Sequence, residues 1–298
     1  MIAPTEHYFD KLTGAARLLF FLQSTCFFPI IKKNTQGGPI MLKAVFFDID
    51  GTLLSHKTNT VPASAVRALE LLREKGILTF IATGRHLPEL KKLRPLDGLH
   101  FDGYVALNGQ YCCNEEGVIY HCPIEKSDIA TLLDYLKEHP HPCILVEKDQ
   151  MYINFHNEDV ARVQAAIHSE MPTLGDLDRG YTEPIYQVIL YMKESTLDQL
   201  PELPNIKLTF WNMGGADLIP AKGGKATGIA KVLEHYGIDR SETMAFGDGH
   251  NDVDMFSAVG TAVAMGNACR AAKEAADYIT DKVDEDGIYN ALVHFGVL

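Results

Sequence analysis

From residue 41 onward, short apolar runs alternate with amphipathic helical stretches, and this alternation constrains the fold more than any other feature. Residues 44–47 and 77–82 are apolar runs of strand length. Between them, apolar side chains recur at helical spacing from Pro62 until Gly76. Strands that alternate with helices are typical of an α/β domain with a largely parallel sheet. We therefore predict an α/β core.

In the middle of the chain the pattern of predicted elements changes: short strands occur in pairs, and strands alternate with helices less often. The strand–helix pattern resumes in a helix over residues 225–236, which Gly237 ends. We predict a discontinuous core, residues 41–122 and 213–298, interrupted by a separate α+β domain over residues 123–212. Within these parts we expect further core strands at 103–107, 243–246, 262–265 and 278–280, and an insert helix at 127–138 followed by strands at 143–147, 151–155, 185–192 and 208–211.

The first 40 residues precede this pattern and form an extension whose role the sequence leaves open. Residues 15–31 are rich in apolar side chains, but Gln23 and Pro29 interrupt them, and the stretch is short for a membrane span. It also lacks the small-residue cleavage site of a secretory signal. We expect no membrane association.

Charge and cysteine content narrow the class of protein. The 27 Lys and Arg residues against 39 Asp and Glu give a net charge of -12, which repels nucleic acid backbones. The six cysteines contain no C-x-x-C pair, so we expect reduced thiols in a cytoplasmic protein. The sequence therefore predicts a cytoplasmic protein with a small-molecule partner and no nucleic acid partner.

Polar residues follow three of the predicted core strands at the point where each strand ends. Ligands of open α/β sheets bind at the carboxyl ends of the strands, so residues far apart in sequence can share one crevice. Several acids in one place repel one another unless a cation neutralises them, and Mg²⁺ prefers such oxygen ligands. The residues concerned are Asp48 and Asp50, then Thr83, then Asp248, Asn251 and Asp252.

The order of these motifs resembles the haloacid dehalogenase superfamily. The shared features are D-x-D-G-T at residues 48–52, a strand that ends in Thr, a Lys before a helix, and G-D-G-x-N-D at residues 247–252. The position of the insert resembles the Cof-like sugar-phosphatase branch, which has a type-C2 cap. This resemblance implies a Rossmann-like core with a mostly parallel sheet and an inserted α+β cap domain.

The resemblance also implies a mechanism. Asp48 would be the nucleophile that forms an aspartyl-phosphate, and Asp50 would act as general acid and then as general base. Mg²⁺ would be bound by Asp48, Asp50 and Asp248, with Asp50 contributing its backbone carbonyl. Asp252 would support this site without touching the ion.

The remaining implied residues bind the phosphate group. Thr83, the backbone at Ile49 and Gly84, and Asn251 would donate hydrogen bonds to its oxygens, and a lysine would pair with both phosphate and Asp48. Two lysines compete for that place, Lys222 and Lys225. Lys225 is preferred because it precedes the Gly237-Ile238 helix end by the interval that the family shows, while Lys222 could assist it.

The predicted activity is Mg²⁺-dependent hydrolysis of small phosphomonoesters, with sugar phosphates as the expected substrates. A calcium loop at residues 248–253 is rejected because Val253 stands where that loop requires Gly. A phosphomutase of the same superfamily and a non-catalytic phospho-ligand sensor remain alternatives. The identity of the substrate and the oligomeric state stay open.

Overall fold

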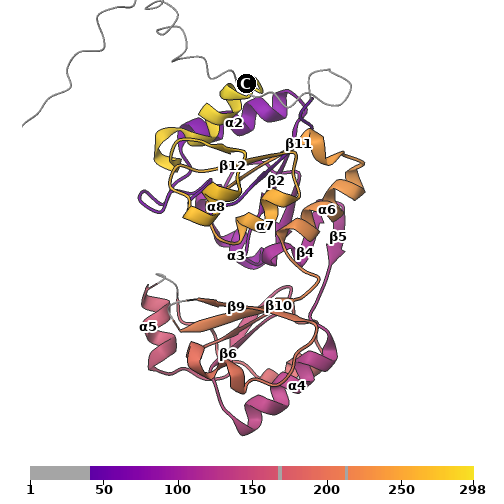
Figure 1. Ribbon diagram of the computed structural model, residues 1–298, viewed down its shortest axis with the longest axis vertical. Helices are drawn as coiled ribbons and strands as arrows, with labels where there is room; N and C mark the ends of the chain where they lie inside the picture. The colour runs from indigo at the N-terminus through magenta and orange to yellow at the C-terminus, as the bar shows by residue number, and fades with distance from the viewer. Residues whose placement is uncertain (1–40, 167–169, 212–213) are drawn as a thin grey trace, which may run out of the picture.

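The computed structural model describes residues 41–166, 170–211 and 214–298, so the extension at residues 1–40 lies outside the described residues. The chain forms two bodies, an α/β core and the insert, joined by short linkers (Figure 1). The core and insert confirm the predicted fold class. Within the described residues, no helix has the length and apolar character needed to cross a bilayer.

The core sheet is mostly parallel and has the order β13-β12-β11-β1-β2-β3-β4-β5. An antiparallel hairpin, β4 and β5, extends one edge, and the sequence prediction missed it. The strands are β1 (Ala44–Phe47), β2 (Leu78–Ala82), β3 (Gly103–Ala106), β4 (Tyr111–Asn114), β5 (Gly117–His121), β11 (Thr243–Gly247), β12 (Thr261–Ala264) and β13 (Tyr278–Ile279). The helices are α2 (Ala63–Glu74), α3 (Leu87–Lys92), α6 (Lys225–Tyr236), α7 (Asp252–Ser257), α8 (Arg270–Ala275) and α9 (Gly287–His294).

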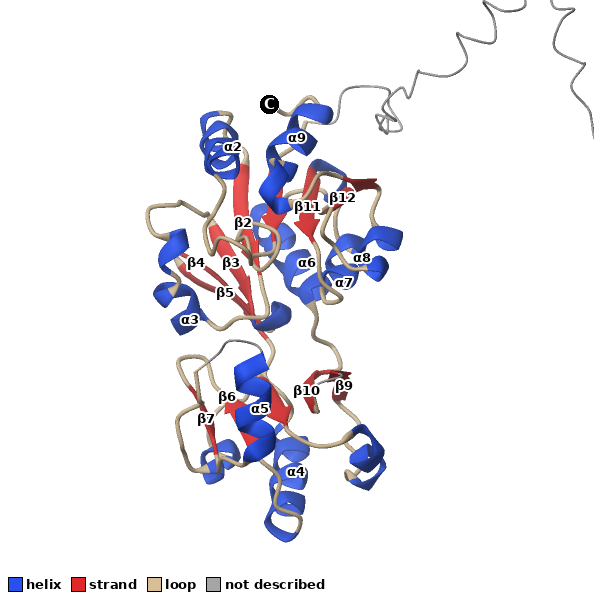
Figure 2. Cartoon of the chain, turned by 90° about the vertical axis from the view of Figure 1, so that its left-hand side faces the viewer, coloured by secondary structure: helices blue, strands red, loops and turns tan. Residues whose placement is uncertain are grey.

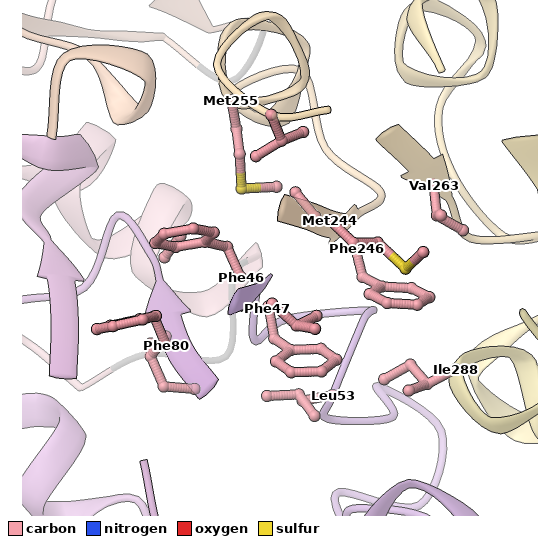
Figure 3. Packing of buried hydrophobic residues seen from close by; sticks show 14 of the residues in the cluster. Phe46, Phe47, Leu53, Phe80, Met244, Phe246, Met255, Val263 and Ile288 are labelled. Atoms are coloured by element: carbon pink, nitrogen blue, oxygen red, sulfur yellow. The ribbon is translucent and has the colours of Figure 1, made fainter. Parts of the chain in front are cut away.

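Strand β1 lies inside the sheet and is buried on both faces, as its unbroken apolar sequence predicts. It pairs in parallel with β11 on one side and β2 on the other. The Phe46 ring stacks on Phe80 at a centroid distance of 5.0 Å, and Phe47 stacks on Phe246 at 5.3 Å (Figure 3). These contacts fix the strand whose end carries Asp48.

The insert is built on a second sheet, separate from the core sheet (Figure 2). Its strands are antiparallel and have the order β7-β6-β8-β10-β9. Its helix α4 packs on one sheet face, in a cluster with Leu145 and Val188, and its helix α5 packs on the other face, with Ile144 and Ile153. The elements are α4 (Lys126–Glu138), β6 (Cys143–Val146), β7 (Met151–Ile153), α5 (Glu158–Ala166), β8 (Gln187–Leu190), β9 (Ile206–Trp211) and β10 (Gly215–Pro220).

The antiparallel sheet extends beyond the expected boundary at residue 212. Strand β10 pairs with both β8 and β9, so this segment is part of the insert sheet although the sequence prediction placed it in the core. The chain then returns through residues 221–224 to α6. A Cβ on Gly109, whose φ is +89°, would lie 2.0 Å from the Gly224 carbonyl oxygen, so this linker packs directly on the core backbone.

Candidate active site

The expected residues meet at one edge of the core sheet. Asp48 follows β1, Thr83 follows β2 and Asp248 follows β11, and these three strands are parallel neighbours. The carboxyl ends of parallel strands lie on the same side of a sheet, so the three side chains point into a shared region. This is the edge from which α3 and α7 begin, next to the insert (Figure 1).

Lys225 connects two of the acids. Its side chain is buried, and its Nζ donates to Asp48 Oδ1 at 2.7 Å and to Asp252 Oδ1 at 2.6 Å. The residue opens α6, and it reaches inward because the preceding linker packs against the core. Lys222, the competing lysine, is exposed. The lysine that lies against Asp48 is therefore Lys225.

The site carries more negative than positive charge. Burial, and then repulsion from Asp252, raises the pKa of Asp48 to about 8, although Lys225 lowers it. Burial and the charge of Asp252 raise the pKa of Asp248 to about 6. Burial lowers the pKa of Lys225, but the charges of Asp48 and Asp252 outweigh this effect and leave the pKa above its ordinary value. One ammonium group is thus shared among acids that repel one another.

This excess of carboxylate oxygens suits a divalent cation. Ligand atoms of Asp48, Asp248 and Asp252 lie within 4.8 Å of one another. Both oxygens of Asp252 accept short hydrogen bonds, one from the Lys225 ammonium and the other from the backbone N–H groups of Asp248 and Gly249, whereas Asp248 accepts only longer ones, at 3.2 and 3.3 Å. The carboxylates of Asp48 and Asp248 are therefore the better candidates for ligands, and an all-oxygen ligand set fits a hard cation.

The turn directly after Asp50 is shaped by the close approach of its backbone to Asp248. Gly51 has a φ of +85°, and a Cβ there would lie 2.2 Å from a carboxylate oxygen of Asp248. Only glycine satisfies both conditions without strain. Thr52 then donates its hydroxyl proton to Asp248 Oδ1 at 3.2 Å.

Asp50 forms an ion pair that the sequence did not predict. Arg85 donates from Nε to Asp50 Oδ2 and from Nη2 to Oδ1, both at 2.7 Å. This two-pronged geometry fixes the carboxylate plane as well as its position. The sequence did place Arg85 near the site, because it follows Thr83 and Gly84 at the end of a strand. The spacing of residues does not give the direction of a loop side chain, so its partner could not be predicted.

The expected phosphate-binding residues gather beside this pair. Thr83 is buried, and its hydroxyl oxygen accepts from the backbone N–H of Arg85 at 3.2 Å, which leaves the hydroxyl proton free to donate. Asn251 donates from Nδ2 to Asn108 Oδ1 at 3.2 Å. A Cβ on Gly84 would lie 3.2 Å from the same Asn108 oxygen, so Gly84 and Asn251 flank one side chain. Ile49 is fully buried beneath the turn.

Asn267 is another residue that the sequence prediction missed. Its Nδ2 donates to the Gly51 carbonyl oxygen at 2.8 Å and to Asp248 Oδ2 at 3.3 Å. Its Oδ1 accepts from the backbone N–H of Val283 at 2.9 Å. Asn267 follows β12, a parallel strand of the same sheet, so the strand-end rule that located Asp48 could also have indicated it.

Another buried carboxylate, Glu147, lies in the insert. Arg179 binds both of its oxygens at 2.8 Å, Tyr152 donates its hydroxyl proton at 2.9 Å, and Gln150 donates from its amide at 3.0 Å. Burial raises the pKa of Glu147, but these four hydrogen bonds outweigh it and hold the pKa below its ordinary value. Glu147 and Arg179 therefore form an ion pair in which both carboxylate oxygens accept hydrogen bonds, as expected of a structural contact.

Comparison with protein families gives one match over most of the chain. The model of a family described as haloacid dehalogenase-like hydrolase matches residues 45–292. A Bacillus subtilis protein, YkrA, provisionally named a phosphatase, is 36% identical over 257 residues, which cover 86% of this chain and 98% of that protein.

Solved structures show the same relationship. BT1666 from Bacteroides thetaiotaomicron, studied among phosphatases of this superfamily, has a TM-score of 0.80 at 34% identity over 88% of this chain and 97% of its own. BT4131, described as a subclass IIB sugar phosphatase, has a TM-score of 0.74 at 35% identity over 86% of this chain and 100% of its own.

Proposed function

The chain belongs to the haloacid dehalogenase-like hydrolases and is a phosphatase of that family, and on this premise we propose that it is a Mg²⁺-dependent enzyme that hydrolyses small phosphomonoesters through an aspartyl-phosphate. The observation that carries the proposal is the Lys225 ammonium shared by Asp48 and Asp252 beside Asp248. Sugar phosphates are the substrates that we expect first, since BT4131 is described as a sugar phosphatase.

In the first step, an oxygen of Asp48 attacks phosphorus, forming an Asp–O–P bond while the bond from phosphorus to the leaving oxygen breaks. Asp50, in its protonated form, transfers a proton to that leaving oxygen. Thr83, Asn251, Lys225 and the backbone at Ile49 and Gly84 donate hydrogen bonds to the phosphoryl oxygens. The Lys225 ammonium orients Asp48 for attack, because it already binds Oδ1.

In the second step, water attacks phosphorus and Asp50 takes its proton. The Asp–O–P bond breaks, phosphate leaves, and the Asp48 carboxylate is restored. When bound, Mg²⁺ would be held by the carboxylates of Asp48 and Asp248 and the backbone carbonyl of Asp50, and it would neutralise charge on the phosphoryl oxygens. Asp252 keeps the Asp248 loop and Lys225 in place.

We also assign the reaction to the cytoplasm. Cys112, Cys113, Cys122, Cys143 and Cys269 are free thiols in the described part of the chain, which is typical of proteins in a reducing compartment.

Acid quenching after a short incubation with ³²P-labelled substrate tests the proposal. We expect label on the wild-type protein when Mg²⁺ is present and none on Asp48→Asn. Free phosphate should accumulate in step with substrate loss. Conversion of a hexose 1-phosphate to the 6-phosphate without free phosphate would instead support a phosphomutase, and tight binding without turnover would support a sensor.

A further inference from the structure

A cavity of about 230 Å³ lies between the core and the insert, beside the residues assigned to proton transfer. Its core wall includes Arg85, His86 and Glu89, and its insert wall is formed by β6, β7, β8, α5 and Tyr191. Arg85 binds both oxygens of Asp50, so the cavity begins next to the group that protonates the leaving oxygen. Its volume is below the range of about 300–1,000 Å³ for drug-sized ligands, so it suits a small organic group.

The polar groups on the core wall already have acidic partners. Arg85 is held by Asp50, and His86 Nδ1 lies 2.7 Å from Glu89 Oε2. The guanidinium and the imidazole that line the cavity are therefore each in contact with a carboxylate. An anion that entered would have to compete with these partners or remain without a counter-charge.

The insert wall is neutral. Its apolar part includes Ile144, Val146 and Ile189, which come from adjacent strands of the insert sheet. Its polar part includes the amides of Gln164 and Gln187. Gln164 donates from Nε2 to the Tyr191 hydroxyl at 3.0 Å, whereas its buried Oε1 has no hydrogen-bond partner among the described residues. The Gln187 amide carries both a carbonyl oxygen and an NH₂ group, so this wall can accept a hydrogen bond from a ligand and donate one to it.

We propose that this cavity takes the leaving group of a phosphomonoester whose organic part is uncharged and combines an apolar face with hydrogen-bonding groups. The inference rests on the proposed function and narrows its substrate class. It also states what the enzyme rejects, namely leaving groups that carry a carboxylate or a second phosphate. Burying such an anion against a neutral wall costs free energy that no cation on that wall offsets.

Two matched substrate pairs test the inference. Sorbitol 6-phosphate differs from 6-phosphogluconate, and glycerol 3-phosphate from 3-phosphoglycerate, in having a hydroxymethyl group in place of a carboxylate. We expect kcat/KM to be at least about tenfold higher for the uncharged member of each pair, a discrimination typical of an unpaired polar group. Equal values, or a preference for the acid, would overturn the inference while leaving the phosphatase assignment intact. Failure to hydrolyse any phosphomonoester, p-nitrophenyl phosphate included, would overturn both.

A charge placed on the insert wall should reverse the preference. Ile189 is only partly buried, so Ile189→Lys can add a cation there, and Ile189→Met is the matched neutral control. We expect Ile189→Lys to lower the ratio of kcat/KM between the uncharged and acidic substrates by about tenfold, and Ile189→Met to leave the ratio within about twofold of wild type. If Ile189→Lys does not melt cooperatively, Gln187→Lys replaces it. An unchanged ratio in a folded lysine variant would contradict the inference.

Discussion

Asp48 in the core and Glu147 in the insert are both buried carboxylates in contact with a cation, yet their pKa values shift in opposite directions. Glu147 pairs with Arg179 and shares it with no second carboxylate among the described residues. It also accepts hydrogen bonds from Gln150 and Tyr152. Asp48 shares Lys225 with Asp252 and lies close to Asp248. The charge of Glu147 is compensated by its hydrogen bonds and the residue stabilises the insert, whereas the charged form of Asp48 is disfavoured and a bound cation would stabilise it.

The largest effect that separates the two carboxylates is catalytic. We expect Asp48→Asn to lower kcat for phosphate release by at least about 10⁴, as for other nucleophile substitutions. Glu147→Gln should keep kcat for p-nitrophenyl phosphate within about threefold of wild type, since Glu147 touches no residue of the proposed mechanism. Steady-state phosphate release measures kcat of both variants. Substantial turnover by Asp48→Asn would show that Asp48 is not the nucleophile.

The next largest effect concerns Arg85, the partner of Asp50. We expect Arg85→Met to lower kcat by about 10²-fold, because the acid is no longer held in one orientation. Arg85→Lys should restore little of the lost kcat, since one ammonium group cannot reproduce two parallel hydrogen bonds. The loss should be larger for sorbitol 6-phosphate than for p-nitrophenyl phosphate, whose leaving group needs less protonation. Equal losses for both substrates would show that Arg85 does not act through Asp50.

A substitution at Asn267 tests how Asp248, a proposed metal ligand, is positioned. Asn267→Ala removes a hydrogen bond to Asp248 and another to the Gly51 carbonyl. We expect Mg²⁺ affinity to fall about 10–100-fold, the usual cost of losing a group that orients a ligand. Isothermal titration with Mg²⁺ measures this directly. Asn290→Ala, which breaks an exposed bond to Asp281, is the control, and equal affinity in both variants would contradict the role of Asn267.

For Glu147 the expected effect is on stability. Glu147→Gln weakens the charge-assisted bonds from Arg179 and should lower the free energy of unfolding by about 1–3 kcal/mol. Because the folded pKa of Glu147 is lowered, its contribution is present above the unfolded pKa and is lost as pH falls through the folded pKa. Urea unfolding at pH 7 and pH 3.5 should therefore show a smaller difference between variant and wild type at the lower pH.

The last contrast is the opposite pH dependence of stability at Asp48. Its folded pKa is raised to about 8, so the folded state binds the extra proton and loses stability as pH rises from about 4 to 8. In chelator, the melting temperature of Asp48→Asn minus that of wild type should therefore increase between pH 5 and pH 8. Each kcal/mol of change in the free energy of unfolding shifts the melting temperature by about 2–4 °C. Parallel melting curves across this range would count against the excess charge at Asp48.

The sequence predicted the parts of the site that depend on strand ends. The apolar run before Asp48 and the runs before Thr83 and Asp248 place these residues at one edge, because parallel strands share a direction. It did not predict the Arg85–Asp50 pair, since two loop side chains meet through tertiary packing. Strand β10 was missed because Gly214 and Gly215 interrupt the pattern where the strand begins. The neutral wall of the cavity depends on the register of β6 with β8, which no local pattern encodes.

The position of β1 in the core sheet also affects how the chain can fold during synthesis. Ala44 pairs with Leu78, which emerges soon after it, and with Thr243, which emerges only after the whole insert. Contacts of such long sequence separation form late, and domains generally fold as units as the chain appears. The insert can therefore fold first, while the edge of β1 that later pairs with β11 is still unpaired. Until β11 is in place Asp48 lacks Asp248, so an unfinished chain has the proposed nucleophile but an incomplete site.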